Sequence, residues 1–362
     1  MSKDPDLASW LQLTLTPGLG AAAIRGLLAQ FGLPENIFAA PRAQLERIVG
    51  PAAAALLRSD ETTAAVGNAL HWAEAPGHAV VTLADAEYPK LLLEIADPPP
   101  LLYAIGRLEL LARPALAIVG SRNATAQGMR NAEQFAAAFS AAGLTIVSGL
   151  AMGIDAAAHA GGLAGEGSTV AVLGTGVDVT YPRQNAPLAA RIAESGLLLS
   201  EFALGSAGAA HHFPRRNRLI SGLAQGCLVV EAALASGSLI TARAAAEQGR
   251  EVFAVPGSIH SPLSKGCHAL IKQGAKLVES ADDVLAELTA FRRTATASTR
   301  APSPSQAGED PLLAHMGFDP VDVDSICARS GLTVERVCAD LLRLELGGRV
   351  AALPGGMYQR LN

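Results

Sequence analysis

The chain has 362 residues, of which 50% are hydrophobic and 17% are charged, and its formal net charge is −5. This composition excludes an intrinsically disordered protein, and the length allows two or three domains. The apolar runs are broken by Gly, Ser or Glu well short of the roughly 20 residues that span a bilayer. The N-terminal sequence MSKDPDLASW lacks a basic leader followed by an apolar stretch, so we expect a cytoplasmic protein without membrane contact.

Residues 1–75 are predicted to form a small domain of short helices, because apolar residues recur at helical spacing in LASWLQLTL and AAIRGLLAQFG. The sequence TPGLG places Gly18 and Gly20 directly before a helix, as in SAM-like or helix-hairpin-helix units. Such a turn brings backbone N–H groups close to a phosphate at a helix N-terminus. A purely structural turn explains the same residues, and both interpretations stay open.

Residues 76–290 are predicted to form an α/β domain with a Rossmann-like, doubly wound and mainly parallel sheet. From about residue 115, short apolar runs alternate with Ala-rich helical stretches, which is typical of buried strands joined by crossover helices. The expected strands are ALAIVG, LTIVSG, STVAVLG, LLLSEF, CLVVEA, EVFAVPG and AKLVES. Such sheets bind ligands at the carboxyl ends of their strands, where the glycines, serines and arginines of this sequence gather.

Residues 291–309 are rich in Ser, Thr, Ala and Pro and are expected to form a linker. Residues 310–362 follow the order helix, turn, helix and two strands joined by PGG, which predicts a winged-helix domain. Its second helix, TVERVCADLLRLEL, carries Glu335, Asp340 and Glu345 where a DNA-reading helix is normally basic. We therefore expect this domain to contact a protein rather than base edges.

Basic residues concentrate in the centre of the chain. Residues 113–276 hold 13 Lys and Arg against 9 Asp and Glu, whereas the rest of the chain holds 15 against 24. Residues 211–276 alone hold 8 basic against 3 acidic residues. A basic patch between acidic ends suits a polyanion bound at one place, although solvated helix faces give the same counts.

Several positions in this central region suit an anion. Arg122 follows the first predicted parallel strand by two residues, where its guanidinium can grip a phosphate or pair with a neighbouring carboxylate. The loops 148–155 and 235–242 consist of small residues before helices, which exposes N–H groups to an anion or simply lets helices pack closely. Lys265 precedes another helix and can reach the same edge.

The stretch HHFPRRNRLI, residues 211–220, combines an aromatic ring with three arginines. Proteins that bind single-stranded nucleic acid use this combination, because stacking tolerates any base while cations follow the backbone. The alternative is that Phe213 anchors the core and Pro214 holds it in place.

Signatures of cofactor binding and catalysis are missing from the sequence, which contains no dinucleotide fingerprint, Walker loop or serine nucleophile elbow. No His and Asp residues fall at metal-ligand spacing, and the four cysteines form no CxxC pair, which predicts reduced, mostly buried thiols. We expect no cofactor, no metal and no catalytic residue. The carboxylates near strand ends are expected to orient loops or cap helices: Asp155, Asp178, Glu201 and Glu231.

The chain carries a series of ordered motifs: YPKLLLEIADPPPLLYAIG, IVGSRNAT, SGLAMGID, LGTGVDVTYPRQN, SEFALG, FPRRNRLISGLA, VVEAALASGSLITARAAAEQGREVFAVPG and LIKQGA. In this order and spacing they resemble the DNA-processing protein A family, also called DprA or Smf, over about residues 86–280. The resemblance implies sequence-independent binding of single-stranded DNA, a homodimer formed through the Rossmann-like domain, and no enzymatic activity. It also implies protection of incoming strands and loading of the RecA recombinase past single-strand binding protein, in natural transformation and DNA recombination.

The resemblance places the DNA site on residues that match the family's motifs. These are Arg122, Phe213, Arg215, Asn217, Arg218, Ser236, Gly237, Ser238 and Lys265. His268 departs from the pattern, because many members have an asparagine at that position. His211 and His212 stand where the family often has a cation, so we expect DNA binding to strengthen at mildly acidic pH.

Two other functions fit parts of the sequence. Similar Rossmann-like folds hydrolyse the N-glycosidic bond of nucleoside monophosphates, which suits a phosphate-binding edge, but their PGGxGT signature is absent. A protein scaffold whose basic patch meets an acidic partner is the other alternative. Comparing the binding of oligonucleotides with and without bases distinguishes that scaffold from a DNA-binding protein.

Overall fold

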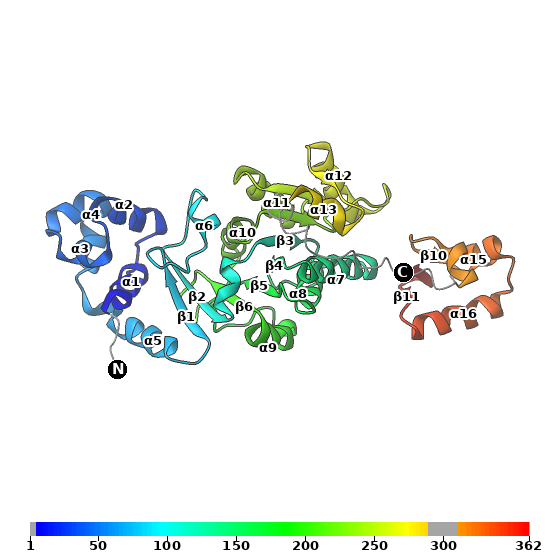
Figure 1. The fold of residues 1–362 in the computed structure, drawn as a ribbon, viewed down its shortest axis with the longest axis horizontal. Coiled ribbons are helices and arrows are strands. Elements are labelled where there is room, and N and C mark those ends of the chain that lie inside the picture. The colour runs from blue at the N-terminus through cyan, green and yellow to red at the C-terminus, as the bar shows by residue number, and fades with distance from the viewer. Residues whose placement is uncertain (1–4, 289–309, 362) are drawn as a thin grey trace.

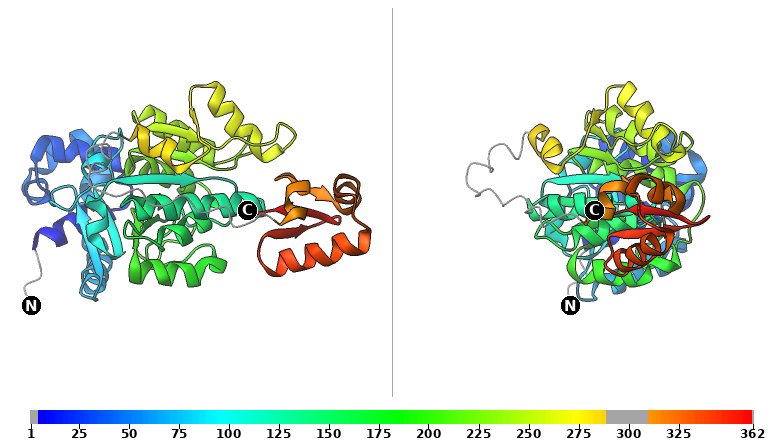
Figure 2. Two further views of the ribbon diagram at one scale, coloured as in Figure 1. Left: turned by 45° about the vertical axis from the view of Figure 1, so that its right-hand side comes forward. Right: turned by 90° about the vertical axis from the view of Figure 1, so that its right-hand side faces the viewer.

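A group of short helices leads into a nine-stranded sheet, and a small winged module follows it (Figure 1). The computed structural model describes residues 5–288 and 310–361 of the chain. The expected linker, residues 291–309, lies outside the described residues. Figure 2 shows the N-terminal helices and the winged module at opposite ends of the sheet.

The N-terminal unit is helical, as predicted. Its elements are α1 (Pro5–Leu15), α2 (Ala21–Phe31), α3 (Pro34–Ala39), α4 (Arg42–Leu56), the 3-10 helix η1 (Asp60–Thr62) and α5 (Thr63–Ala73). Gly32, with a φ of 80°, ends α2, and Pro34 begins α3, where a missing N–H leaves no hydrogen bond unmade. Leu13, Leu27 and Ile37 are fully buried in a core that belongs to this unit.

The central sheet has the strand order β1-β2-β6-β5-β4-β3-β7-β8-β9. The strands are β1 (His78–Thr82), β2 (Leu101–Gly106), β3 (Ala115–Val119), β4 (Thr145–Ser148), β5 (Thr169–Val172), β6 (Leu197–Ser200), β7 (Gly226–Val229), β8 (Glu251–Ala254) and β9 (Lys276–Leu277). From β6 to β9 all neighbours are parallel, which confirms the predicted Rossmann-like sheet. The antiparallel additions of β2 to β6 and of β1 to β2 were not predicted.

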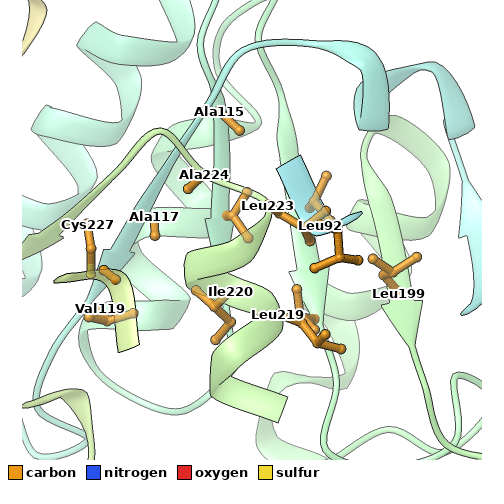
Figure 3. Packing of buried hydrophobic residues seen from close by; sticks show 14 of the residues in the cluster. Leu92, Ala115, Ala117, Val119, Leu199, Leu219, Ile220, Leu223, Ala224 and Cys227 are labelled. Atoms are coloured by element: carbon orange, nitrogen blue, oxygen red, sulfur yellow. The ribbon is translucent and has the colours of Figure 1, made fainter. Parts of the chain in front are cut away.

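Helices cover both faces of the sheet. They are α6 (Lys90–Leu93), α7 (Ala126–Ala141), α8 (Ile154–Gly162), α9 (Ala186–Ser195), α10 (His212–Gly222), α11 (Ser238–Glu247), α12 (Lys265–Lys272) and α13 (Ala281–Glu287), with short 3-10 helices at Leu108–Ala112, Arg183–Asn185 and Pro262–Ser264. On one face, Leu219 and Ile220 of α10 pack with Val119 and Leu199 (Figure 3). On the other, α7 contributes Phe139 to a second core. The strands are thus buried on both faces, which leaves their carboxyl ends for binding.

The C-terminal module is a winged helix, as predicted. Its elements are α14 (Pro311–Met316), β10 (Val321–Asp322), α15 (Val323–Ser330), α16 (Val334–Leu346), β11 (Val350–Leu353) and β12 (Met357–Arg360). Asp310 caps α14 by accepting a hydrogen bond from the Leu312 N–H (3.1 Å). Gly355 and Gly356, with φ of 83° and 72°, form the turn between the last two strands.

Within residues 5–288 and 310–361, no helix is both long and apolar enough to cross a bilayer. The same residues contain no group of three or more His, Cys, Asp or Glu placed to hold a metal ion. The four cysteines are free thiols; Cys227 and Cys267 are buried, whereas Cys338 is exposed on α16.

Candidate nucleic-acid interface

A pocket of about 680 Å³ opens at the carboxyl ends of β3 and β7. The chain runs from β3 through β4 and β5 toward one edge of the sheet and from β7 through β8 toward the other, so strand order reverses between β3 and β7. Open α/β sheets bind their ligands at this switch point. The wall of the pocket comes from the loops after β3 and β7 and from the first turns of α10 and α11.

The loop after β3 presents Arg122 as an exposed side chain. Main-chain bonds fix this loop, because the Ser121 N–H donates to the Glu231 carbonyl (2.7 Å) and the Ile154 N–H donates to the Ser121 carbonyl (3.2 Å). Gly153 has a φ of 76° and lies against the main chain of this loop, so that an added Cβ would stand 2.4 Å from the Ser121 carbonyl oxygen. No carboxylate of the described chain forms an ion pair with Arg122, so its cation faces the pocket.

Phe213, in the first turn of α10, lies next to this cation. Its ring centroid is 5.6 Å from the guanidinium carbon of Arg122. The ring is half-buried and does not belong to the buried core, which favours a role in the pocket over the alternative of a core anchor. It packs on the loop after β5 at Gly174, where an added Cβ would stand 2.8 Å from the ring.

Tyr181 extends the aromatic surface beyond Phe213. The two ring centroids are 5.4 Å apart with 40° between the planes, and Tyr181 is 50% exposed. Gly208 lies beside both rings: a Cβ added to it would stand 3.5 Å from the Phe213 ring and 3.8 Å from the Tyr181 ring. Tyr181 was not predicted at the site. Its only signal was an aromatic within the motif LGTGVDVTYPRQN, and nothing local shows that this ring meets Phe213.

The first turn of α11 forms the opposite wall. The hydroxyl oxygens of Ser236 and Ser238 are 2.7 Å apart, and the Ser238 N–H donates to the Ser236 oxygen (3.3 Å). Because α11 begins at Ser238, just after Gly237, the positive end of its helix dipole faces the pocket. Asn217 of α10 also lines the pocket. The arrangement offers hydroxyl, amide and main-chain groups that suit phosphate oxygens.

Three residues expected at the site lie outside this pocket. Arg215 and Arg218 turn to the other side of α10, where both pair with Glu201; the Arg215 Nη2 lies 3.0 Å from its Oε2. Arg218 is only 15% exposed, whereas Arg215 is 47% exposed. Lys265 is exposed at the start of α12, two residues after Leu263, which does line the pocket. The structure therefore groups Arg122, Phe213, Asn217 and Ser236–Ser238 and separates them from these three cations.

Arg216, which the sequence analysis did not assign to the site, lies beneath the pocket and is 4% exposed. Its Nη1 donates to the Gly149 carbonyl (2.7 Å) and to the Val172 carbonyl, so it ties α10 to the carboxyl ends of β4 and β5. Burial lowers the pKa of Arg216 to about 10, and the nearby Asp155 opposes this shift. Arg216 therefore stays charged at neutral pH and shapes the floor of the pocket.

Several main-chain N–H groups of the loop 148–155 donate hydrogen bonds within the protein. The carboxylate of Asp155 accepts a hydrogen bond from the Gly149 N–H (3.1 Å), and the His159 Nε2 accepts one from the Leu150 N–H (3.2 Å). Burial lowers the pKa of His159 to about 3, so this ring is neutral. These contacts favour the alternative in which the loop serves packing, because the N–H groups of Gly149, Leu150 and Ala151 are used within the protein.

The other carboxylates near strand ends have structural roles, as predicted. Glu231 accepts hydrogen bonds from the Thr125 N–H (2.9 Å) and hydroxyl (2.6 Å), which fixes the start of α7 to the end of β7. Asp178 accepts a hydrogen bond from the Gly205 N–H (2.9 Å). Both residues orient loops around the pocket.

The comparison with protein families agrees with this geometry. The model described as "DNA recombination-mediator protein A" matches residues 79–289, and the "DprA winged helix domain" matches residues 296–356. The chain belongs to the DprA/Smf family. The first match covers the Rossmann-like sheet from the second residue of β1 onward, and it includes every residue of the pocket.

Individual DprA/Smf proteins match along most of their length. The chain is 44% identical over 309 residues to Protein Smf of Escherichia coli K12, which covers 82% of this chain and 81% of that protein. It is 50% identical over 206 residues to DNA processing protein DprA of Streptococcus pneumoniae, or 57% of this chain and 73% of that protein. The crystal structure of DprA from Streptococcus pneumoniae superposes with a TM-score of 0.68 at 41% identity, over 77% of this chain and 96% of that one.

A second solved structure concerns the binding of single-stranded DNA. DNA processing protein A from Helicobacter pylori, solved for its single-stranded DNA binding mode, superposes with a TM-score of 0.53 at 28% identity. The match covers 59% of this chain and 96% of that one.

His212 and His268 are not among the described residues that line the pocket. The His212 ring stacks on Phe202 with centroids 4.1 Å apart, and its Nδ1 lies 3.2 Å from the Gly174 carbonyl oxygen. The His268 Nε2 lies 3.0 Å from the Gly257 carbonyl oxygen, which requires a proton on this nitrogen for a hydrogen bond. None of the residues that line the pocket is a histidine in the described chain.

Proposed function

We propose that this DprA/Smf chain binds single-stranded DNA without sequence preference in the pocket at the ends of β3 and β7. One observation carries the proposal: the ring of Phe213 lies 5.6 Å from the unpaired guanidinium of Arg122, in a pocket of about 680 Å³. An aromatic face next to a cation matches a base next to its phosphate.

A single strand fits this site better than a duplex. Inside a duplex the faces of each base are covered by neighbouring base pairs, so Phe213 has nothing to stack on. In a single strand every base offers a face, and stacking does not depend on which base it is. The expected binding is therefore selective for single strands and tolerant of sequence.

Each residue of the pocket has a proposed role. Arg122 holds a phosphate through its guanidinium, and the first turn of α11 at Ser236, Gly237 and Ser238 receives another phosphate oxygen. Asn217 hydrogen-bonds the nucleotide between them. The exposed cations Arg215 and Lys265 follow the strand where it leaves the pocket, while Arg218 is too buried for that role.

We propose binding rather than catalysis as the role of this pocket, with no cofactor. Asp155 is the single acidic side chain among the described residues that line it. Its carboxylate accepts hydrogen bonds from the Gly149 N–H (3.1 Å) and the Ala151 N–H (3.4 Å). Hydrolysis of a glycosidic bond needs a carboxyl group that reaches the leaving group, and this one is turned toward its own loop.

The wider role follows from the family. We propose a cytoplasmic homodimer that protects incoming strands and loads RecA onto them, displacing single-strand binding protein, in natural transformation and DNA recombination. Within it, residues 1–75, 76–290 and 310–362 act as separate domains, and the winged helix contacts a protein. ATP hydrolysis by RecA on DNA coated with single-strand binding protein measures loading. Wild type should restore the hydrolysis, and Arg122→Ala should not.

Binding itself is tested with two labelled strands of equal length, one of thymidine nucleotides and one abasic. Fluorescence anisotropy should report at least about tenfold tighter binding to the strand with bases, because stacking on an aromatic side chain contributes about 1–3 kcal/mol per base. A duplex of equal length should bind more weakly than the thymidine strand. Equal binding to the abasic strand would support a general polyanion site, as in the scaffold alternative, and would contradict the proposal.

A further inference from the structure

Helix α10 has two functional faces. One face lines the pocket with Phe213 and Asn217, whereas the opposite face carries Arg215 and Arg218. The side chains between these faces are buried in the core of the sheet (Figure 3). Phe213 and the two arginines thus belong to one helix, so a displacement of α10 moves the pocket face and the arginine face together.

Glu201, directly after β6, holds the arginine face. Its side chain is 2% exposed and accepts hydrogen bonds from Arg215 (3.0 Å) and from Arg218. Burial raises the pKa of Glu201, and the two guanidinium groups oppose that rise. The pairing thus fixes α10 to the end of β6 with little solvent between the charges.

The chain of charges continues to the N-terminal unit through Asp97. The Arg218 Nε lies 3.4 Å from the Asp97 Oδ2, and the Arg218 Nη1 donates to the Asp97 carbonyl. The other carboxylate oxygen, Oδ1, pairs with Arg25 of α2, whose Nη1 also lies 3.4 Å from the Pro98 carbonyl oxygen. Arg25, Asp97, Arg218 and Glu201 therefore form one continuous series of contacts from α2 to α10, which we name the clasp.

Two polar atoms of the clasp lack a hydrogen-bond partner in the part of the chain that the structure describes. Within the described residues, the Glu201 Oε1 and the Arg218 Nε are buried atoms without a hydrogen-bond partner. In a buried site of low dielectric each hydrogen bond is stronger than in water and each unpaired polar group costs more, so losing one contact of the clasp has a large effect on the rest. A cavity of about 200 Å³ beside the clasp is lined by Gly20 and Ile24 of the N-terminal unit on one side and by Glu201 on the other. Trp10 and Leu11 of α1 pack in one buried core with Leu101 and Tyr103 of β2, so the N-terminal unit is anchored to the sheet and this cavity leaves room for movement only beside the clasp.

We infer that the N-terminal helical unit sets the position of α10 through the clasp and thereby sets the affinity of the pocket for single-stranded DNA. Arg25, Asp97 and Arg218 are positioning residues in this account, and none of them contacts the DNA. The inference rests on the proposed function, since it concerns the affinity of the same pocket.

The test uses Arg25→Ala in the full chain, because Arg25 lies farthest from the pocket and its loss leaves the Arg218 pair with Glu201 intact. Arg47→Ala is the matched control: it is an exposed arginine of the same unit whose guanidinium contacts its own helix at the Ala43 carbonyl (3.4 Å). Anisotropy with a thymidine strand should show about threefold to tenfold weaker binding for Arg25→Ala. Arg47→Ala should bind like wild type, and Arg25→Lys should recover part of the loss.

Two further readouts separate positioning from direct contact with DNA. The salt dependence of binding should stay unchanged in Arg25→Ala, because the slope falls only when a phosphate contact is lost. Without DNA, the amide hydrogens of α10 should exchange faster in Arg25→Ala than in Arg47→Ala, because loss of the clasp loosens the helix.

The experiment distinguishes a failure of the proposed DNA binding from a failure of the clasp. A wild-type protein that binds no single-stranded DNA contradicts the proposed function and removes this inference with it. Wild type that binds, together with Arg25→Ala that binds equally tightly with unchanged exchange in α10, overturns the clasp alone. A reduced salt slope in Arg25→Ala would also overturn it, because Arg25 would then contact a phosphate.

Discussion

Phe213 packs its ring on Gly174, where a Cβ would come within 2.8 Å of the ring's Cδ1 atom. Real Cβ contacts are never this short, so the ring can hold its present position only above a glycine. One side of the ring is thus supported by the backbone after β5, and the ring remains half-exposed next to Arg122. A substitution at Gly174 therefore tests whether DNA binding depends on the position of the Phe213 ring.

Gly174→Ala should displace the ring of Phe213 and weaken binding to a thymidine strand about threefold to thirtyfold, since overpacking forces side chains out of their positions. Titration by anisotropy measures the loss. Gly67→Ala in α5 is the control, because no atom lies within 4 Å of its added Cβ. Unchanged binding by a folded Gly174→Ala variant would mean that the ring's position does not matter.

Phe213→Ala should weaken binding to single strands by about 1–3 kcal/mol through loss of base stacking. Phe213→Tyr should keep most of the affinity, because it retains an aromatic face. The thermal unfolding midpoints of both variants should stay close to that of wild type, since the ring is half-exposed. A folded Phe213→Ala variant with wild-type affinity would rule out stacking at this residue.

Arg218→Ala should lower the free energy of unfolding by about 3 kcal/mol, because it leaves the buried carboxylate of Glu201 with one partner fewer. Urea denaturation measures this change. Arg191→Ala, at an exposed position of α9, should change the same quantity by less than about 0.5 kcal/mol. Equal stabilities of the two variants would show that the Arg218–Glu201 pair contributes nothing.

His159 should make stability depend on pH. Its pKa falls from 6.5 to about 3 on folding, because burial disfavours the charged ring. Between these values the unfolded chain binds a proton that the folded chain does not, so stability should rise with pH by up to about 1.4 kcal/mol per unit and level off above pH 6.5.

The measurement is urea unfolding from pH 5 to pH 8, where most carboxylates are already ionised. His159→Gln should unfold more easily at every pH, because the Nδ1 contact with the Thr169 hydroxyl (2.7 Å) is lost. Its stability should nevertheless rise less between pH 5 and pH 6.5 than that of wild type. Parallel curves for the two proteins would show that His159 does not carry the pH dependence.

Most of the fold could be predicted because its signals are local. Each parallel strand is a short apolar run followed by a small residue and a helix, and this pattern needs no knowledge of distant residues. The antiparallel strands β1 and β2 gave no such signal, because they extend the sheet at its edge, where β2 pairs with the distant strand β6 and β1 pairs with β2. Register between distant segments is not encoded in any one window of sequence.

The site could be predicted in part for the same reason. Arg122 and Phe213 are marked by residue type and by position after a strand or before a helix. Arg215 and Arg218 looked equally suitable, but helical spacing turns them to the other face of α10, where both pair with Glu201 at the end of a different strand. Tyr181 was missed because its contact with Phe213 exists only in the folded chain.

The most direct test of the account is the salt dependence of binding to a labelled thymidine strand, measured by anisotropy for wild type and Arg122→Ala. The account predicts that wild type binds this strand more tightly than a duplex of equal length. It also predicts that folded Arg122→Ala binds more weakly, with a slope of log affinity against log salt reduced by about one unit. The same affinity and slope in both proteins would contradict the account, because Arg122 would then hold no phosphate.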